Sequence, residues 1–339
     1  MEEQEELLSH NALVIIGIVS GIMFVLGMFL LTLGYNEAFY VEDPLVRAIF
    51  QLITDLGEDI TFIMIMAILY IVYDKRFAKN LAFNLLFTGY LNSFLKGVFQ
   101  DPRPDSNIDP SEDYGYIETS YGFPSGHTQS AVTVWGYIAY EFKDKPKQYI
   151  VPIILSILIF LISISRMIIG AHDLEDVIGG YVIGICFLIA YIYFEPIISP
   201  IINELSLQIK ILIAVVVSIL LFAISVLLFP TAGLDLVKNA PLYADEGTFG
   251  SVTGAMLGLG VGYLLENEYI KYEPSELNNK QKTINLFIGI ILLLITFYGL
   301  DLIISGNVFL RFIRYVILAF ILTFIAPLIF TKIDRKKAE

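Results

Sequence analysis

Cysteine is almost absent from this 339-residue sequence, which contains only Cys186, inside an apolar run. A single cysteine excludes any disulfide bond within the chain, and therefore a small disulfide-stabilised scaffold. Charged residues are also scarce: they make up 16% of the chain, whereas a typical soluble domain has about a quarter. Lys and Arg number 21 against 34 Asp and Glu, and they form no dense cluster. We therefore expect no nucleic-acid partner.

Apolar residues, by contrast, make up 56% of the chain, and several runs exceed the roughly 18 residues that a transmembrane helix needs. No alternation typical of a membrane β-barrel is visible. The sequence therefore predicts an all-α, polytopic membrane helix bundle. The predicted spans are 11–34, 57–74, 79–98, 126–142, 149–167, 172–194, 207–229, 247–267, 284–304 and 308–331. Residues 44–56 are too short and too charged to span, and they predict an interfacial or re-entrant helix.

The distribution of basic residues predicts the orientation of this bundle. Most Lys and Arg residues fall in loops that this layout places on one side, which the positive-inside rule identifies as cytoplasmic. Both termini are then cytoplasmic. The N-terminus lacks the positive region of a secretory signal, so the first apolar run is expected to be a retained span.

Three polar groups fall at the opposite, extracytoplasmic ends of the spans. They are Lys96 and Arg103 in KGVFQDPRP; Ser125, Gly126 and His127 in PSGH; and Arg166, His172 and Asp176 in SRMIIGAHDLED. Cationic side chains gathered at a low-dielectric boundary require anions. Phosphate fits best, because its several oxygens match the guanidinium fork.

The two histidines lie in settings suited to catalysis. The amides of Ser125, Gly126 and His127 open a predicted helix, and helix N-termini bind anions. His172 and Asp176 are four residues apart and share one helix face. The carboxylate can accept the proton of one ring nitrogen, which leaves the other free to attack. His127, on another helix, can protonate a leaving oxygen.

Together the three groups resemble the three-part signature of the type 2 phosphatidic acid phosphatase (PAP2) superfamily. The pattern is Lys96-x6-Arg103-Pro104, then Pro124-Ser125-Gly126-His127, then Ser165-Arg166-x5-His172-x3-Asp176. The resemblance covers roughly residues 45–194. It implies a PAP2-like six-helix catalytic core, which we place in residues 1–200, followed by about four additional transmembrane helices of unknown role in residues 201–339.

The resemblance also implies a role for each signature residue. His172 would attack phosphorus and form a phosphohistidine, Asp176 would orient it, and His127 would protonate the leaving group. The residues expected to hold the phosphate are Lys96, Arg103, Ser125, Gly126 and Arg166. No metal or other cofactor is expected, because the signature groups contain no cluster of acids that Mg²⁺ would need. Asp173 and Glu175 lie outside the signature; the helix dipole favours an acid such as Asp173 at the helix start.

The implied activity is hydrolysis of a lipid phosphomonoester or diphosphate at the outer leaflet, since head groups reach the ends of spans while tails stay in the bilayer. Hydrolysis of a soluble sugar phosphate and phosphotransfer to an acceptor other than water remain alternatives. A non-enzymatic transporter or receptor that binds phospholipid is a further alternative. Binding alone does not require the pair His127 and His172, so the enzyme is favoured.

Four glycines recur at four-residue spacing in the predicted span 247–267. They are Gly250, Gly254, Gly258 and Gly262. Small residues on one helix face allow another backbone to approach closely. The stripe predicts either packing within the chain or a homodimer interface.

Overall fold

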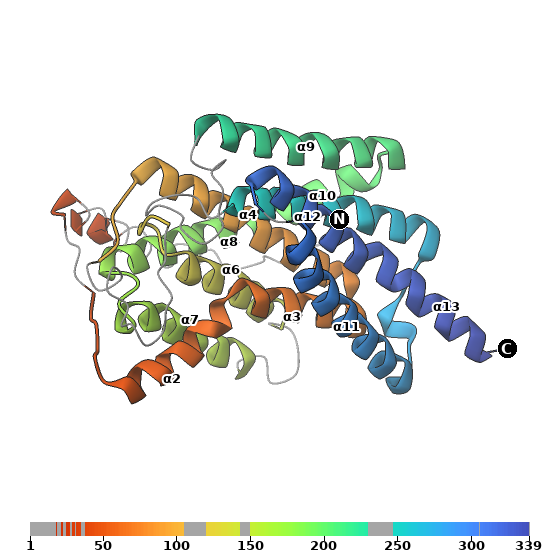
Figure 1. Ribbon diagram of the computed structural model, residues 1–339, viewed down its shortest axis with the longest axis horizontal. Coiled ribbons are helices and arrows are strands. Elements are labelled where there is room, and N and C mark those ends of the chain that lie inside the picture. The colour runs from red at the N-terminus through yellow and green to blue at the C-terminus, as the bar shows by residue number, and fades with distance from the viewer. Residues whose placement is uncertain are drawn as a thin grey trace, which may run out of the picture. The chain divides into compact units, whose positions relative to one another are not determined.

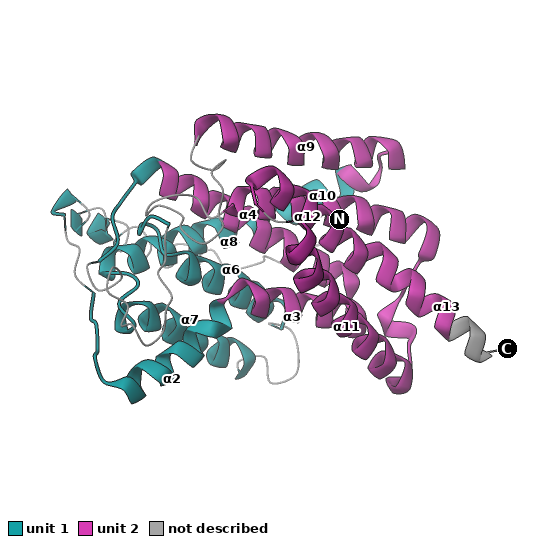
Figure 2. Ribbon diagram, viewed as in Figure 1, with its two compact units in different colours: residues 1–57, 98–201 teal, residues 58–97, 202–339 magenta. Residues whose placement is uncertain are grey.

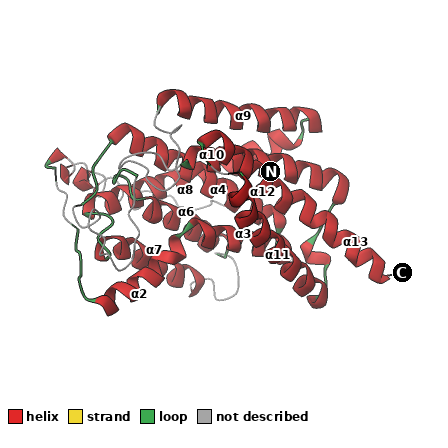
Figure 3. Ribbon diagram, in the orientation of Figure 1, coloured by secondary structure: helices red, strands yellow, loops and turns green. Residues whose placement is uncertain are grey.

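All regular structure in the described residues of the computed structural model is helical (Figures 1 and 3). The structure describes residues 38–104, 120–142, 150–229, 247–304 and 306–338, with side chains as far as 333, and isolated residues between 18 and 34. The predicted span 11–34 therefore lies mostly outside the described residues, and residues 105–119 and 230–246 lie wholly outside them. For the described part, the all-α prediction is confirmed.

The chain divides into two compact units, and the first comprises residues 1–57 and 98–201 (Figure 2). Both α2 and α6 pack against α7. The helical elements of this unit are α2 (Pro44–Thr54), the 3-10 turn η1 (Asp55–Gly57), α6 (Gly126–Glu141), α7 (Ile150–Ile168) and most of α8 (Leu174–Asn203).

The second unit comprises residues 58–97 and 202–339. In it α10 packs against α9 and α12, and α3 packs against α11. Its elements are α3 (Asp59–Val72), most of α4 (Lys75–Phe99), α9 (Leu207–Leu228), α10 (Thr248–Leu265), the π-helical η3 (Glu266–Ile270), the 3-10 turn η4 (Pro274–Glu276), α11 (Asn279–Ile303), α12 (Val308–Phe320), the π-helical η5 (Ile321–Ile325) and α13 (Ala326–Ala338). Residues 58–97 group here with the C-terminal helices, and the assignment of residues 1–200 as catalytic core stays a prediction.

Within the described residues, six helical segments are long and apolar enough to cross a membrane, which makes the chain an integral membrane protein. They are α7, α8, α9, α10 continued by η3, α11, and α12 continued to Ile333. Three other predicted spans are helices that do not meet this criterion. α3 has 14 residues and α6 has 16, while α4 has 25 but is too polar. One face of α4 buries Asn84, Thr88, Asn92 and Lys96.

A short helix forms within residues 44–56, as predicted. Asp43 caps α2, because its Oδ1 accepts hydrogen bonds from the N–H groups of Leu45 and Val46, both at 3.0 Å. Leu45, Ile49 and Leu52 form an exposed apolar face, while Thr54 at the other end is fully buried. The location of α2 at the membrane interface stays a prediction.

The glycine stripe of α10 packs against α12 and η5 of the same chain. A Cβ atom on Gly254 or Gly258 would collide with the carbonyl oxygen of Phe312 or Val316, respectively. Gly250 and Gly262 meet Val308 and Thr323 just as closely. Packing within the chain is therefore the alternative that the structure supports. The homodimer proposed through these four glycines has no support, because α12 and η5 cover the face that a second copy would need.

Candidate active site

A glycine-dependent turn places His172 directly after α7. Gly170 has a φ of +80°, a backbone conformation that only glycine adopts without strain. The N–H groups of Ala171 and His172 both donate to the carbonyl oxygen of Arg166, at 3.0 and 3.1 Å. The chain thus reverses within six residues, and it presents His172 at the start of α8 beside the C-terminal end of α7.

His172 is held between a carboxylate and a guanidinium. Its Nδ1 lies 2.7 Å from Oδ2 of Asp176, and its Nε2 lies 3.0 Å from Nη1 of Arg103. His172 is 1% exposed and Asp176 is fully buried. Because a guanidinium can only donate, Nε2 must carry the lone pair and Nδ1 the proton, which it donates to Asp176. This tautomer leaves Nε2 with the electron pair that a nucleophile needs.

Arg103 connects the segment before α6 to the segment before α8. Its Nε donates to the Ser120 carbonyl at 2.7 Å, and its Nη2 donates to the Ser120 hydroxyl at 2.9 Å. Its Nη1 also donates to the Ala171 carbonyl at 2.8 Å. The side chain is 3% exposed, so these bonds hold the guanidinium firmly against the ring of His172. Ser120 could not be recognised from the sequence, because a single serine in a polar loop carries no local signal.

His127 and Arg166 form a second pair. The Nη1 of Arg166 lies 3.5 Å from Nε2 of His127 and donates to the Thr54 hydroxyl at 3.0 Å. His127 sits half-buried in the first turn of α6, whereas Arg166 is 2% exposed. Thr54 was also missed from the sequence; only its place on the polar side of an amphipathic segment distinguished it.

The start of α6 is bound directly to the start of α8. The N–H of Ser125 donates to the Asp176 carbonyl at 2.9 Å. Gly180 of α8 lies so close that a Cβ there would be 2.5 Å from the carbonyl oxygen of Ser125. The Ser125 hydroxyl is fully buried and has no hydrogen-bond partner among the described residues. Gly126, at the first position of α6, completes the helix N-terminus where an anion would be favoured.

Lys96 belongs to the second compact unit, whereas the other predicted site residues belong to the first. It lies in the last turn of α4 with 8% of its surface exposed. It continues a stripe of buried polar side chains at four-residue spacing, Asn84, Thr88 and Asn92. Its contribution to phosphate binding stays a prediction.

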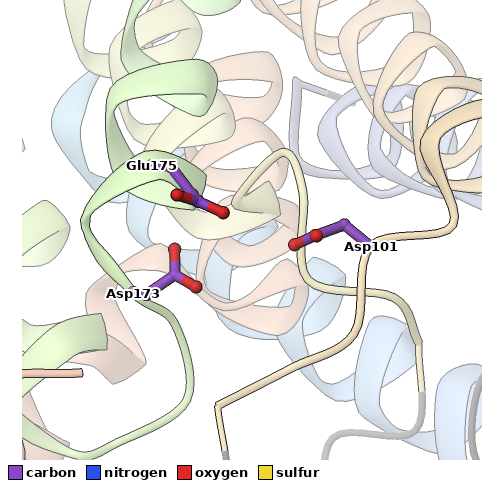
Figure 4. Close-up of side chains that lie close together, drawn as sticks. All are labelled: Asp101, Asp173 and Glu175. Atoms are coloured by element: carbon purple, nitrogen blue, oxygen red, sulfur yellow. The ribbon is translucent and has the colours of Figure 1, made fainter. Parts of the chain in front are cut away.

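Next to these pairs, Asp101, Asp173 and Glu175 bring one carboxylate oxygen each within 4.8 Å of one another (Figure 4). The expectation that the signature groups contain no acidic cluster is therefore wrong. Asp101 belongs to the first group and the other two to the third, and only the fold brings them together. Asp173 precedes α8 and caps it: its Oδ1 accepts the N–H of Asp176 at 3.0 Å. The pKa of the Asp173 carboxyl is raised to about 7, mainly by burial; the charge of Asp101 adds to the rise, while this hydrogen bond opposes it.

The arrangement can bind and attack a tetrahedral oxyanion. Two buried guanidinium groups, the Ser125 hydroxyl and the amides opening α6 supply donors for several oxygens. His172 supplies a lone pair, and His127 lies on a different helix, where it can exchange a proton with a leaving oxygen.

The sequence of this chain is similar to those of known lipid phosphatases. Lipid phosphate phosphatase delta of Arabidopsis thaliana is 28% identical over 123 residues, which are 33% of this chain and 30% of that protein. Phosphatidylglycerophosphatase B of Bacillus subtilis (strain 168) is 37% identical over 101 residues, 28% of this chain and 46% of that protein. The chain thus spans less than half the length of these curated relatives.

Among solved structures, the first transmembrane PAP2 type phosphatidylglycerolphosphate phosphatase from Bacillus subtilis aligns with 56% of this chain and 88% of its own, at 20% identity and a TM-score of 0.39. Since that TM-score is low, the helical architecture rests on the helices described above. Residues 77–198 match the PAP2 superfamily model, and residues 250–338 match the model described as PAP2 superfamily phosphatase, transmembrane extension. Both matches carry the same family name, and the first includes all three signature groups: this chain belongs to the PAP2 superfamily.

Proposed function

We propose that the chain is a membrane-embedded phosphatase that hydrolyses a lipid phosphomonoester or diphosphate through a phosphohistidine. The observation that carries the proposal is the buried triple Arg103–His172–Asp176. The ring lies 2.7 Å from the carboxylate through Nδ1 and 3.0 Å from the guanidinium through Nε2. A site for binding alone has no need of a histidine whose tautomer is set by a carboxylate and whose lone pair faces the anion-binding group.

In the first step the phosphate oxygens accept the hydrogen bonds of Arg103 and Arg166, which frees Nε2 of His172. Its lone pair forms a bond to phosphorus while the bond to the leaving oxygen breaks. The proton of His172 Nδ1 stays hydrogen-bonded to Asp176, whose charge stabilises the cationic phosphohistidine. His127 donates its proton to the leaving oxygen, and the lipid alcohol or lipid monophosphate departs.

In the second step His127, now neutral, accepts a proton from water. The hydroxide oxygen bonds to phosphorus as the bond to His172 breaks, and inorganic phosphate leaves. Nη1 of Arg166 lies 3.5 Å from Nε2 of His127, so a phosphate that binds Arg166 also lies beside the proposed acid. No step passes through a metal ion.

A lipid substrate is favoured by where the site residues lie along the chain. His172 lies between α7 and α8, and both helices are candidate membrane spans. Both relatives carry names of lipid phosphatases, a lipid phosphate phosphatase and a phosphatidylglycerophosphatase. The buried ion pair of Lys75 and Glu266, at 2.9 Å, places the α3–α4 turn beside the end of α10, two segments that the charge distribution assigns to the cytoplasmic side. This agrees with cytoplasmic termini and an active site on the extracytoplasmic face.

The test is phosphate release by the full-length protein in detergent micelles. The panel contains phosphatidic acid, phosphatidylglycerol phosphate, a sphingoid-base phosphate, a polyprenyl diphosphate and a sugar phosphate. We expect release from at least one lipid and none after His172→Ala. With a radiolabelled phosphate group, wild type should retain an acid-labile, alkali-stable label that His172→Ala lacks.

The control is His10→Ala, which removes the only histidine outside the site and should leave release unchanged. If phosphate is released from the sugar phosphate alone, the substrate is a soluble phosphate and the proposed lipid substrate is wrong. If wild type binds a lipid phosphate but releases no phosphate, the protein is a binding protein and the phosphatase proposal fails. Retention of the label by His172→Ala would refute the nucleophile.

A further inference from the structure

The three acids beside the active site converge from two distant segments. Asp101 follows α4, whereas Asp173 precedes α8 and Glu175 lies in its first turn. One carboxylate oxygen from each lies within 4.8 Å of the other two, and the close-up shows the carboxylates pointing toward one another (Figure 4). Asp173 is fully buried, Glu175 is 1% exposed and Asp101 is half-buried. These are therefore not solvated surface acids.

Two of the carboxylate oxygens have no hydrogen-bond donor in the part of the chain that the structure describes. Oδ2 of Asp173 and Oε2 of Glu175 are buried, and neither has a hydrogen-bond partner among the described residues. The other oxygen of Asp173 is already used to cap α8. A buried carboxylate without a donor is costly, and three close together repel one another. The Arg103 guanidinium offsets part of this charge, but the bonds described above direct it to Ser120, Ala171 and His172.

We infer that Asp101, Asp173 and Glu175 bind one divalent cation that prefers oxygen ligands, such as Ca²⁺ or Mg²⁺. Ca²⁺–oxygen distances are about 2.3–2.6 Å, so two ligand oxygens on opposite sides of the ion lie about 4.6–5.2 Å apart and adjacent ligands lie closer together. Oxygens that all lie within 4.8 Å of one another are therefore close enough to surround Ca²⁺. Mg²⁺ holds its ligands at about 2.0–2.1 Å, and the spacing admits this ion as well if the carboxylates close in on it.

The cation would position active-site residues and would not touch the substrate. Asp101 is two residues before Arg103, and Asp173 directly follows His172. A shared ion would join the same two segments that the 3.0 Å contact between Arg103 and His172 joins. The signature residues supply none of the three carboxylates, so the site is separate from the proposed chemistry.

The experiment measures binding alone, so its outcome does not depend on phosphatase activity. Full-length protein in a neutral detergent is stripped with a chelator, which is then removed. Mn²⁺ binding is followed by electron paramagnetic resonance and Ca²⁺ binding by calorimetry. We expect one saturable site per chain. Asp101→Asn and Glu175→Gln should each weaken binding at least about tenfold, a loss typical even of changes next to a ligand.

The matched control is Glu42→Gln, which neutralises an exposed acid of the same compact unit and should bind like wild type. Circular dichroism reports whether each variant is folded, and Asp101→Asn, in a half-buried loop position, is the less disruptive of the two. Wild-type protein that shows no saturable binding of either ion up to millimolar concentration would overturn the inference. So would folded variants that bind like wild type; the three carboxyls would then share protons instead.

Discussion

Gly180→Ala tests whether the contact between α8 and the start of α6 sets the geometry of the active site. The added Cβ would lie 2.5 Å from the carbonyl oxygen of Ser125 and 3.1 Å from Cβ of Thr128. Real Cβ contacts below 3.0 Å are essentially absent, so the two helices must separate by roughly 0.5–1 Å. The obstacle is a backbone atom, and no side-chain rotation can relieve it.

The displacement should reduce turnover more than stability. Overpacking lowers the free energy of unfolding by about 1–3 kcal/mol. Replacing glycine by alanine inside a helix raises it by up to about 1 kcal/mol, because alanine has the higher helix propensity. The same movement stretches the 2.9 Å hydrogen bond from Ser125 N–H to the Asp176 carbonyl. It thereby shifts the donors of α6 relative to His172. A misplacement of about 1 Å costs on the order of a hundredfold in rate, so we expect kcat to fall about 10- to 100-fold.

The assay is steady-state phosphate release on the best substrate of the panel, together with a thermal melt. Gly299→Ala is the control, because it makes the same change in α11 at a position where, outside the helix's own backbone, no described atom lies within 4 Å of the new Cβ. It should keep kcat and keep or raise the melting temperature. If Gly180→Ala behaves like Gly299→Ala, the close contact is not restrictive. If Gly180→Ala has a lower melting temperature but the kcat of wild type, the packing of α8 on α6 does not set the geometry of the site, and the prediction is refuted.

Three other contacts each lead to a prediction. Asp176→Asn should lower kcat about 10³- to 10⁴-fold with little change in KM, because an amide cannot stabilise the His172 cation; a loss below tenfold would contradict that role. Lys75→Met should lower the free energy of unfolding, followed by a thermal melt, by about 3–5 kcal/mol, because it leaves Glu266 buried and charged. Adding Glu266→Leu should recover most of that loss. A double variant as unstable as Lys75→Met would argue against the ion pair. Gly254→Ala should lower the melting temperature, while the particle mass measured by light scattering stays that of wild type. A variant that loses a dimer but keeps the wild-type melting temperature would contradict packing within the chain.

Local features of this chain could be predicted from sequence because they depend on a few consecutive residues. The apolar runs predicted α7, α9 and α11 to within a few residues. Gly170, four residues after Arg166 in the third signature group, has a φ of +80° and turns the chain before His172. The four-residue spacing of His172 and Asp176 predicted that their side chains meet, and the structure has them 2.7 Å apart, although His172 lies two residues before α8 and not on its face. Periodicity and turn chemistry carry this information without reference to the rest of the fold.

Contacts between segments could not be predicted in this way. Ser120 and Thr54 receive hydrogen bonds from Arg103 and Arg166, yet each is one hydroxyl among many in the sequence. Helices α3 and α4 form within the predicted spans 57–74 and 79–98, but α3 is short and α4 buries polar side chains along one face, so their role as membrane spans stays a prediction.

The roles of Asp173 and Glu175 could not be predicted from the sequence, because they depend on contacts that only the fold creates. Asp173 uses one oxygen to cap α8 and directs the other into the acidic cluster. Asp173→Asn would therefore disturb the helix start, and with it Asp176 and His172, whether or not a cation binds. Glu175 has no hydrogen bond to its own helix start among those described, so Glu175→Gln separates the two roles. A loss of cation binding in Glu175→Gln with phosphate release retained would mean that the catalytic pair and the acidic cluster share a segment but work independently.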